Sequence, residues 1–212
     1  MIYLIGGVPR CGKTTVAKKL SRVLSIPWVP ADYLASVVRA FIPKLDWPKK
    51  LPLRYIKHIK NKNDNDLFYN THSAAQIMGL YMKQAKTTWK GIENFIEYAI
   101  SEEQDYIIEG HQIQPAFLQK MKRNKLWSNI KVVFIYKEDT KKILEGIHSG
   151  DSKRDWELQH TKKEETLHKI AHWISAFGKK IKNDADKYHF RTFNMDGNFK
   201  EKTDGVVNYL KK

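Results

Sequence analysis

The sequence predicts one α/β domain in which a parallel sheet is covered by helices on both faces. Short apolar, β-prone runs alternate along the chain with longer segments whose apolar residues recur at helical spacing. Strands that are separated by helices favour right-handed crossovers and parallel pairing. The chain has 212 residues, enough for one such domain with a core and too few for two full domains.

The first predicted strand covers residues 1–5 and ends in two glycines. The apolar residues of the next segment, 13–24, fall on one helical face, so strand, loop and helix follow one another. A second short strand is expected at 26–30. Asp32 is then a candidate N-cap for a helix over 33–41.

Residues 43–66 differ in composition from their surroundings. Several prolines, many lysines and an Asn/Asp-rich run predict a loop-rich insertion with one short helix. Trp47, Arg54, Tyr55 and His58 within it could form a flap that recognises a substrate or a patch that faces nucleic acid. A solvated loop with a few anchoring aromatic residues is the preferred interpretation.

The second half of the chain continues the alternation of helices and strands. Helices are expected at 67–86, 89–102 and 115–123, strands at 106–108, 131–136 and 188–193, further helices from Asp139 and from Asp155, and a final helix that ends at Leu210. The insertion and the helices after it would occupy about 43–104 of a single 1–212 domain.

The charge balance is strongly basic, with 38 Lys and Arg against 23 Asp and Glu and a net charge of +15. Such a charge could attract nucleic acid. Only seven of the 38 basic residues are Arg and the lysines are scattered, so a solvated lysine-rich surface is favoured over a nucleic-acid groove. No apolar run reaches the roughly 18 residues of a membrane span, which predicts a cytoplasmic protein without a membrane partner. The oligomeric state is left open.

The segment 7–14 matches the phosphate-loop pattern G-x-x-x-x-G-K-[ST] between a predicted strand and a predicted helix, the context that this motif requires. Glycines let successive backbone N–H groups point inward, and the helix N-terminus adds its positive dipole end. Lys13 would reach the β- and γ-phosphates, and the Thr14 hydroxyl would ligate the metal. Cys11, the single cysteine, is interpreted as a small filler residue. ATP with Mg²⁺ is therefore expected on Gly7, Val8, Pro9, Arg10, Cys11, Gly12, Lys13, Thr14 and Thr15.

The run from Ile5 to Thr15 resembles the opening of small P-loop kinases of the nucleoside/shikimate-kinase-like group, in particular 2-phosphoglycerate kinase-like proteins. Residues 28–34, continuing to Arg39, are similar to the second strand and acceptor-side helix of these kinases. The sequence Ile-Ile-Glu-Gly-His at 107–111 is similar to their turn after the third strand.

This resemblance implies a three-layer P-loop NTPase fold with a five-stranded parallel sheet of order 2-3-1-4-5. It also implies an acceptor site between the second and third strands, a basic lid at about 146–165 and an adenine edge at 196–198. The sequence departs from the pattern in two ways, because no Asp at a strand end supplies the metal-side Walker B carboxylate and the only arginine of the lid is Arg154.

Asp32 and Glu109 both follow predicted strand ends, where ligands bind in doubly wound sheets. Either carboxylate could orient an acceptor hydroxyl or accept its proton. Asp32 could equally serve as a helix N-cap. A functional role near the metal or the acceptor is favoured for Glu109, because a carboxylate directly after a buried strand needs a partner or a ligand.

Four further residues complete the candidate site. Arg39 could clamp an anionic acceptor or be an ordinary surface arginine. His111 could contact the acceptor, although packing within its turn is favoured. Lys153 and Arg154 could stabilise charge on the transferred phosphoryl group as a lid closes, and the alternative is a simple turn between helices.

These patterns predict a phosphotransferase that moves the γ-phosphate of ATP to a small acceptor with a hydroxyl group. Both an anionic and a neutral acceptor are compatible with this prediction. Catalytic roles fall to Lys13, Asp32, Glu109 and Arg154, and acceptor binding to Asp32, Arg39, Glu109 and His111. Two alternatives remain open. One is a kinase or ATPase that acts on nucleic acid through the basic surface, and the other is an ATP-binding regulator that does not turn over.

Overall fold

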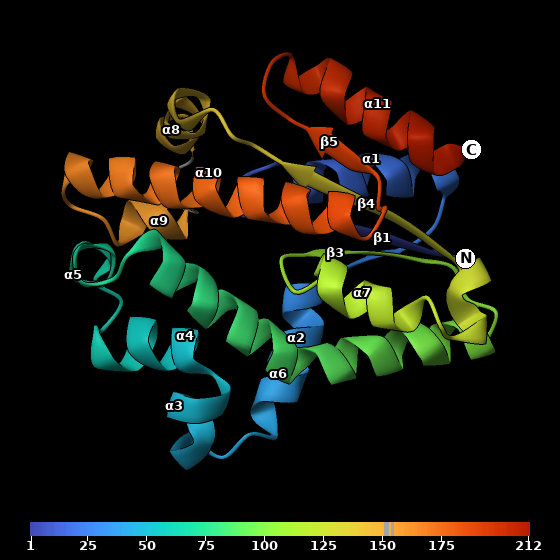
Figure 1. Cartoon of the computed structure of the whole chain (residues 1–212), viewed down its shortest axis with the longest axis horizontal. Helices are drawn as coiled ribbons and strands as arrows, with labels where there is room; N and C mark the ends of the chain where they lie inside the picture. Colours follow the sequence, from blue (N-terminus) through green and yellow to red (C-terminus); the bar gives the residue numbers. More distant parts are fainter. Residues whose placement is uncertain (151–152, 154) are drawn as a thin grey trace.

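A five-stranded parallel sheet lies at the centre of the computed structural model, which describes residues 1–150, Lys153 and residues 155–212 (Figure 1). Its strands are β1 (Ile2–Gly7), β2 (Trp28–Pro30), β3 (Tyr106–Gly110), β4 (Ile130–Tyr136) and β5 (Thr192–Asn194). The strand order is β2-β3-β1-β4-β5, which confirms the predicted order. The central strand β1 is buried along its whole length, as expected for a parallel strand covered on both faces.

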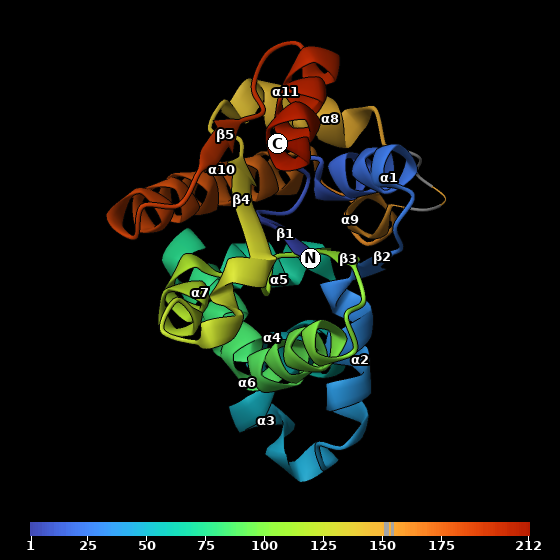
Figure 2. The same cartoon turned by 90° about the vertical axis from the view of Figure 1, so that its right-hand side faces the viewer.

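Helices cover both faces of this sheet (Figure 2). One face carries α1 (Lys13–Leu24) and α11 (Phe199–Lys211), which pack against each other. The other face carries α6 (Ala74–Ser101), α7 (Pro115–Met121) and α10 (Glu164–Lys187). The arrangement confirms the predicted three-layer α/β fold. No helix among the described residues combines the length and the apolar character that a membrane crossing requires.

The chain between the second strand and α6 is more helical than the sequence predicted. After α2 (Ala31–Ala40) come a 3₁₀ turn (Lys44–Asp46), α3 (Trp47–Lys50), α4 (Pro52–Arg54), a π-helical turn (Tyr55–Lys60) and α5 (Asn65–Thr71). Pro48 and Pro52 occupy the first turns of α3 and α4, where a missing N–H costs nothing, and Pro43 precedes the 3₁₀ turn, so these prolines begin helical turns instead of breaking them. Leu51 and Leu53 are buried, and the interpretation as a solvated loop is therefore wrong.

The predicted boundary between helices at 67–86 and 89–102 is also wrong. The break lies at Ser73, whose side chain forms a capping box with Gln76 at the start of α6. The helix then continues through Thr87 and Thr88, whose hydroxyl groups donate to the carbonyl oxygens of Lys83 and Gln84 at 3.3 Å and so do not compete for backbone N–H groups.

After β4, helices begin at the two predicted positions, and the residue at each position caps its helix. Asp139 caps α8 (Thr140–His148) and Asp155 caps α9 (Trp156–Gln159). The helix from Asp155 ends after four residues, and α10 begins separately at Glu164. A 3₁₀ turn (Lys125–Asn129) precedes β4. The last strand begins at Thr192, later than the predicted 188, because Tyr188 still belongs to the C-terminal cap of α10.

Candidate active site

The phosphate loop joins β1 to α1 in a conformation that its glycines permit. Gly12 has a φ of 95° and Gly7 a φ of 148°, both in the region that side chains disfavour. A Cβ at Gly7 would lie 2.1 Å from the carbonyl oxygen of Ile135, and one at Gly12 would lie 2.5 Å from the ring of Phe199. The loop is therefore enclosed by the end of β4 and the start of α11.

The side chains of the loop fold onto its own backbone. Lys13 is 9% exposed, and its Nζ donates to the carbonyl oxygen of Val8 at 2.6 Å. Cys11 is fully buried and contacts the same carbonyl, and burial raises the pKa of its thiol. A neutral, inaccessible thiol agrees with the filler role that we predicted for Cys11. Pro9 is half-buried, whereas Thr14 and Thr15 are exposed at the start of α1.

Glu109 lies directly beside the phosphate loop. It is the penultimate residue of β3 and pairs in register with Ile5 of β1. Its carboxylate is 6% exposed and accepts a hydrogen bond from the Thr14 hydroxyl at 2.8 Å. The parallel pairing of β3 with β1 thus brings a buried carboxylate to the hydroxyl that the motif predicts as a metal ligand.

Asp32 occupies the first turn of α2 and does not cap it. The helix begins at Ala31 after Pro30, so the predicted N-cap role is wrong. The Asp32 carboxylate instead accepts a hydrogen bond from the side-chain amide of Gln112 at 2.7 Å. Sequence reasoning missed Gln112, which is buried two residues beyond the end of β3 and ties the acceptor-side helix to the turn after that strand.

A cavity of about 320 Å³ opens beside Asp32. Its walls come from α2, the insertion, α6 and α9, and its lining residues are Asp32, Arg39, Leu53, Arg54, Lys57, His58, Tyr81, Gln84, Trp156 and Glu157. Asp32 and Arg39, two of the predicted acceptor-binding residues, thus line one cavity together with residues of the insertion, which the sequence analysis interpreted as a loop. The cavity holds more cationic than anionic side chains.

Two guanidinium groups face this cavity from different elements. Arg39 is half-buried, and burial lowers its pKa, with the neighbouring charge of Arg54 acting in the same direction and Asp32 opposing both. Arg54 stacks on the ring of Trp47, with 5.5 Å between its guanidinium carbon and the ring centre. Two like charges held this close favour the binding of an anion between them.

Lys57 is a cation that the sequence gave no reason to single out. It lies in the π-helical turn, is 5% exposed, and burial lowers its pKa. Its Nζ lies 3.8 Å from the ring centre of Trp156 and 3.5 Å from the carboxylate of Glu157. Both partners belong to α9, so this short helix forms one wall of the cavity.

His111 follows β3 and packs edge-to-face on Tyr81, with ring centres 5.1 Å apart. Burial lowers its pKa to about 4, the charges of Lys13 and Arg39 lower it as well, and Asp32 opposes them. Its ring is therefore neutral at pH 7. Lys13 belongs to the phosphate loop, and Arg39 and Asp32 belong to α2. Both elements therefore lie close enough to His111 for their charges to shift its pKa.

The segment that we predicted as a lid contacts the phosphate loop through Arg10. The Arg10 guanidinium forms a partly buried ion pair with Asp155 and also reaches the carbonyl oxygen of Gly146 at 3.4 Å. Arg10 adopts a φ of 61°, which is unusual for a residue with a side chain. Arg154, our predicted lid arginine, lies outside the described residues, and Lys153 accepts a hydrogen bond from Gln159 through its carbonyl oxygen.

A separate cavity of about 340 Å³ adjoins the loop on the side of α8 and α11. Gly197 and Phe199 line it together with Lys137 and Gly146. The Asp196 side chain is occupied elsewhere, because it accepts hydrogen bonds from the backbone N–H groups of Glu138 and Asp139. Asn198 caps α11. Of the predicted segment 196–198, Gly197 is the residue that lines this cavity.

No protein-family model matches the chain. Mevalonate-3-phosphate 5-kinase from Thermoplasma acidophilum is 29% identical over 140 residues, and the chain spans 62% of the length of that relative and matches it over 65% of its own. The structure of shikimate kinase from Bacteroides thetaiotaomicron superposes with a TM-score of 0.54 at 13% identity over 100% of this chain and 99% of that one. A gluconokinase from Sinorhizobium meliloti 1021 gives 0.50 at 10% identity over 99% and 94%.

The chain has the fold of the P-loop small-molecule kinases. The resemblance that the sequence suggested is confirmed at the level of this group. In this P-loop kinase fold the described site residues divide into two sets. Lys13, Thr14 and Glu109 lie at the loop, and Asp32 and Arg39 lie at the cavity next to it.

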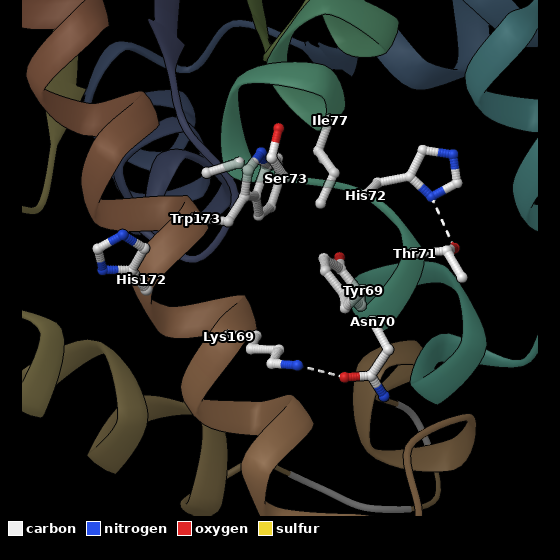
Figure 3. Close-up of a pocket in the computed structure, with 10 residues that line it drawn as sticks. Tyr69, Asn70, Thr71, His72, Ser73, Ile77, Lys169, His172 and Trp173 are labelled. Carbon is white, nitrogen blue, oxygen red and sulfur yellow. Dashed lines mark hydrogen bonds between the residues drawn. The ribbon is translucent and has the colours of Figure 1, made fainter.

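A further cavity, of about 350 Å³, lies between α5, the start of α6 and α10 (Figure 3). None of our predicted site residues lines it. Its polar side chains pair with one another, since Lys169 donates to Asn70 and His72 contacts Thr71. The indole nitrogen of Trp173 has no hydrogen-bond partner, but it is buried beneath the cavity surface. These features favour a packing gap over a ligand site in this P-loop kinase fold.

Proposed function

We propose that this protein is a P-loop kinase that transfers the γ-phosphate of ATP to a hydroxyl group of a small, anionic acceptor. The observation that carries the proposal is the 2.8 Å contact between Thr14 of the phosphate loop and the buried carboxylate of Glu109. Burying a carboxylate costs free energy, and a bond to one hydroxyl group offsets little of that cost. Beside a metal-bound triphosphate, in contrast, the same carboxylate can help to hold the metal.

On the donor side, the backbone N–H groups of the loop and the positive end of α1 would bind the phosphates. Lys13 would exchange the Val8 carbonyl for phosphate oxygens. The described residues contain no cluster of three or more His, Cys, Asp or Glu that could hold a metal. A Mg²⁺ ion that is bound with a nucleotide takes only one or two ligands from the protein, and phosphates and water supply the others. Thr14 and Glu109 fit this small number of protein ligands. Bound Mg²⁺ would neutralise charge that develops between the β- and γ-phosphates.

The base of the nucleotide fits the cavity beside Gly197 and Phe199. Backbone groups would contact the adenine edge there, because the side chains of Asp196 and Asn198 already hold the ends of neighbouring elements. Arg10 would meet the phosphates from the loop itself. We place the lid at about 146–165, where Lys153 and Arg154 would approach the transferred group.

On the acceptor side, Asp32 would orient the attacking hydroxyl and accept its proton, with Gln112 fixing the carboxylate. Arg39 and Arg54 would bind an anionic group of the acceptor, which supports a carboxylate- or phosphate-bearing alcohol. The name of the Thermoplasma relative, a kinase of mevalonate 3-phosphate, is consistent with such an acceptor. In this proposal residues 43–104 form an acceptor-binding insertion of a single 1–212 domain.

The test is ADP release from Mg·ATP in the presence of separate pools of phosphorylated sugars, hydroxy acids, nucleosides and short oligonucleotides. We expect one of the anionic alcohol pools to stimulate release. Lys13→Ala should abolish the stimulation, and Glu109→Gln should reduce it by about 100-fold or more while the fold is retained.

Other outcomes would redirect the proposal. Stimulation by the oligonucleotide pool alone would favour a kinase that acts on nucleic acid. Stimulation by nucleosides alone would show that the acceptor is not anionic. If ATP binds and no pool stimulates release, the protein is a nucleotide-binding regulator and Glu109 has a structural role.

A further inference from the structure

The outer face of α2 is apolar and faces solvent. Tyr33, Val37 and Phe41 follow one another at four-residue spacing and are 69%, 61% and 84% exposed. Ser36 and Ala40, which are also exposed, fill the same face at helical spacing. We call these five residues the α2 stripe. It contains no charged side chain, although the chain as a whole carries a net charge of +15.

The opposite face of the same helix already packs on the rest of the protein. Ala31 and Ala35 are buried against the sheet and α6, and Val38 meets Gly91 of α6 so closely that a Cβ there would lie 2.3 Å away. In Figure 2, α2 runs along the outer edge of the molecule with no element beyond it. The helix is therefore held firmly from within while its apolar stripe is left uncovered.

The stripe is complementary to itself. Its aromatic residues, Tyr33 and Phe41, lie four positions on either side of Val37, and small residues separate them from it. If two copies of α2 pack antiparallel about a two-fold axis through Val37, each Tyr33 meets the Phe41 of the other copy and the small residues let the helices approach. A two-fold interface requires this reciprocal pairing of one surface patch with itself.

The buried area also suits a second copy. Each exposed ring has about 150 Å² left to bury, so the four rings of a symmetric pair contribute about 600 Å², half of the roughly 1,200 Å² at which stable interfaces begin. The rest would come from Val37, from Leu45, which is 95% exposed and follows Phe41 by four residues in the sequence, and from polar surroundings. An uncharged stripe also lets two strongly basic chains meet without placing like charges in contact.

We propose that the α2 stripe is a two-fold interface between two copies of this chain. The interface lies on the side of α2 opposite to Asp32 and Arg39, so the dimer would brace the acceptor-side helix without closing the acceptor cavity.

The first test is sedimentation velocity of the full chain from about 1 to 100 µM. We expect a monomer–dimer equilibrium that Val37→Glu shifts to monomer, because it buries two like charges on the axis. The matched control is Tyr98→Glu, which places the same charge on an exposed aromatic position of α6, 64% exposed and outside the stripe, and should leave the dimer intact.

The second test uses the absence of competing thiols, since the only natural cysteine, Cys11, is fully buried. Under mild oxidation Val37→Cys should form a disulfide-linked dimer quickly, and Tyr98→Cys should not. A wild-type chain that stays monomeric throughout the range, a dimer that survives Val37→Glu, or equal cross-linking of the two cysteine variants would each overturn the proposal.

Discussion

Asp32 and Glu109 lie at the carboxyl ends of neighbouring strands, Asp32 just after β2 and Glu109 as the penultimate residue of β3, yet their surroundings differ. Glu109 is buried and bonded to the Thr14 hydroxyl, whereas Asp32 is exposed at the mouth of the acceptor cavity and bonded to Gln112. A buried carboxylate beside the phosphate loop favours metal and donor chemistry, and an accessible one favours contact with an acceptor hydroxyl. In the function that we propose, the two carboxylates would thus serve different steps of one phosphoryl transfer.

His111 makes the stability of the protein depend on pH. Burial lowers its pKa to about 4 in the folded state, against about 6.5 when unfolded. Between these values the unfolded chain binds the proton and the folded one does not, so the stabilisation present above pH 6.5 is lost as the pH falls toward 4. We expect urea unfolding to show a loss of about 2 kcal/mol between pH 7 and pH 5 from this residue.

His111→Gln should remove this part of the pH dependence, so the wild type should lose about 2 kcal/mol more than the variant over the same interval. His58→Gln is the matched control, because His58 is another half-buried histidine with a lowered pKa, and this variant should keep the contribution of His111. Equal losses in the wild type and in His111→Gln would show that His111 is solvated and charged at pH 5.

At the scale of elements, α9 connects the two halves of the candidate site. Its N-cap, Asp155, holds Arg10 of the phosphate loop, and its first two residues, Trp156 and Glu157, hold Lys57 in the wall of the acceptor cavity. Arg10 keeps this contact in a left-handed conformation that costs roughly 1 kcal/mol or more. A four-residue helix has little stability of its own, so these side-chain contacts determine where it lies.

The substitution Asp155→Asn removes the ion pair with Arg10 but keeps the N-cap of α9. The amide oxygen can still accept from the backbone N–H groups of Glu157 and Leu158, but the charge that holds Arg10 is gone. We expect backbone amides of residues 156–159 to exchange hydrogen roughly tenfold faster, as measured by mass spectrometry. Asp139→Asn makes the same change at the N-cap of α8, away from Arg10, and should leave that exchange unaltered. Unchanged exchange in Asp155→Asn would mean that packing of Trp156 alone holds α9.

The strand order followed from the resemblance to P-loop kinases. The phosphate loop and the helix starts at Asp139 and Asp155 were predictable, because each rests on local sequence or on a motif. The acceptor cavity was not. Arg54 and Lys57 reach it only because buried Leu51 and Leu53 anchor the short helices of the insertion, and proline-rich, lysine-rich composition hides that anchoring. The partnership of Arg10 with Asp155 joins residues 145 positions apart, a separation at which spacing along the chain carries no information.

At the scale of the whole molecule, the positive charge is distributed over the surface and partly used internally. Lys57 and Lys122 lie over the rings of Trp156 and Phe190, and Arg191 over that of Phe193. A groove for single-stranded nucleic acid needs cations and aromatic faces that are open to successive bases. In these pairs each ring is already covered by a cation of the protein, which favours a solvated basic surface over a dedicated groove.

This distribution predicts weak, sequence-independent binding of nucleic acid. A labelled single strand of about 20 nucleotides should bind with a dissociation constant of about 10⁻⁵ M at physiological salt, and fluorescence anisotropy should show the affinity falling steeply with salt concentration. Heparin should compete as well as an unlabelled strand, because both would be held by charge alone. Nanomolar affinity that persists at 200 mM salt, or a preference among base sequences, would contradict this expectation. Such a result would require a surface where aromatic rings stack on bases and neighbouring cations bind the phosphates. The first residues to substitute would then be Arg54, which lines the cavity beside Asp32, and Trp47, whose ring it covers.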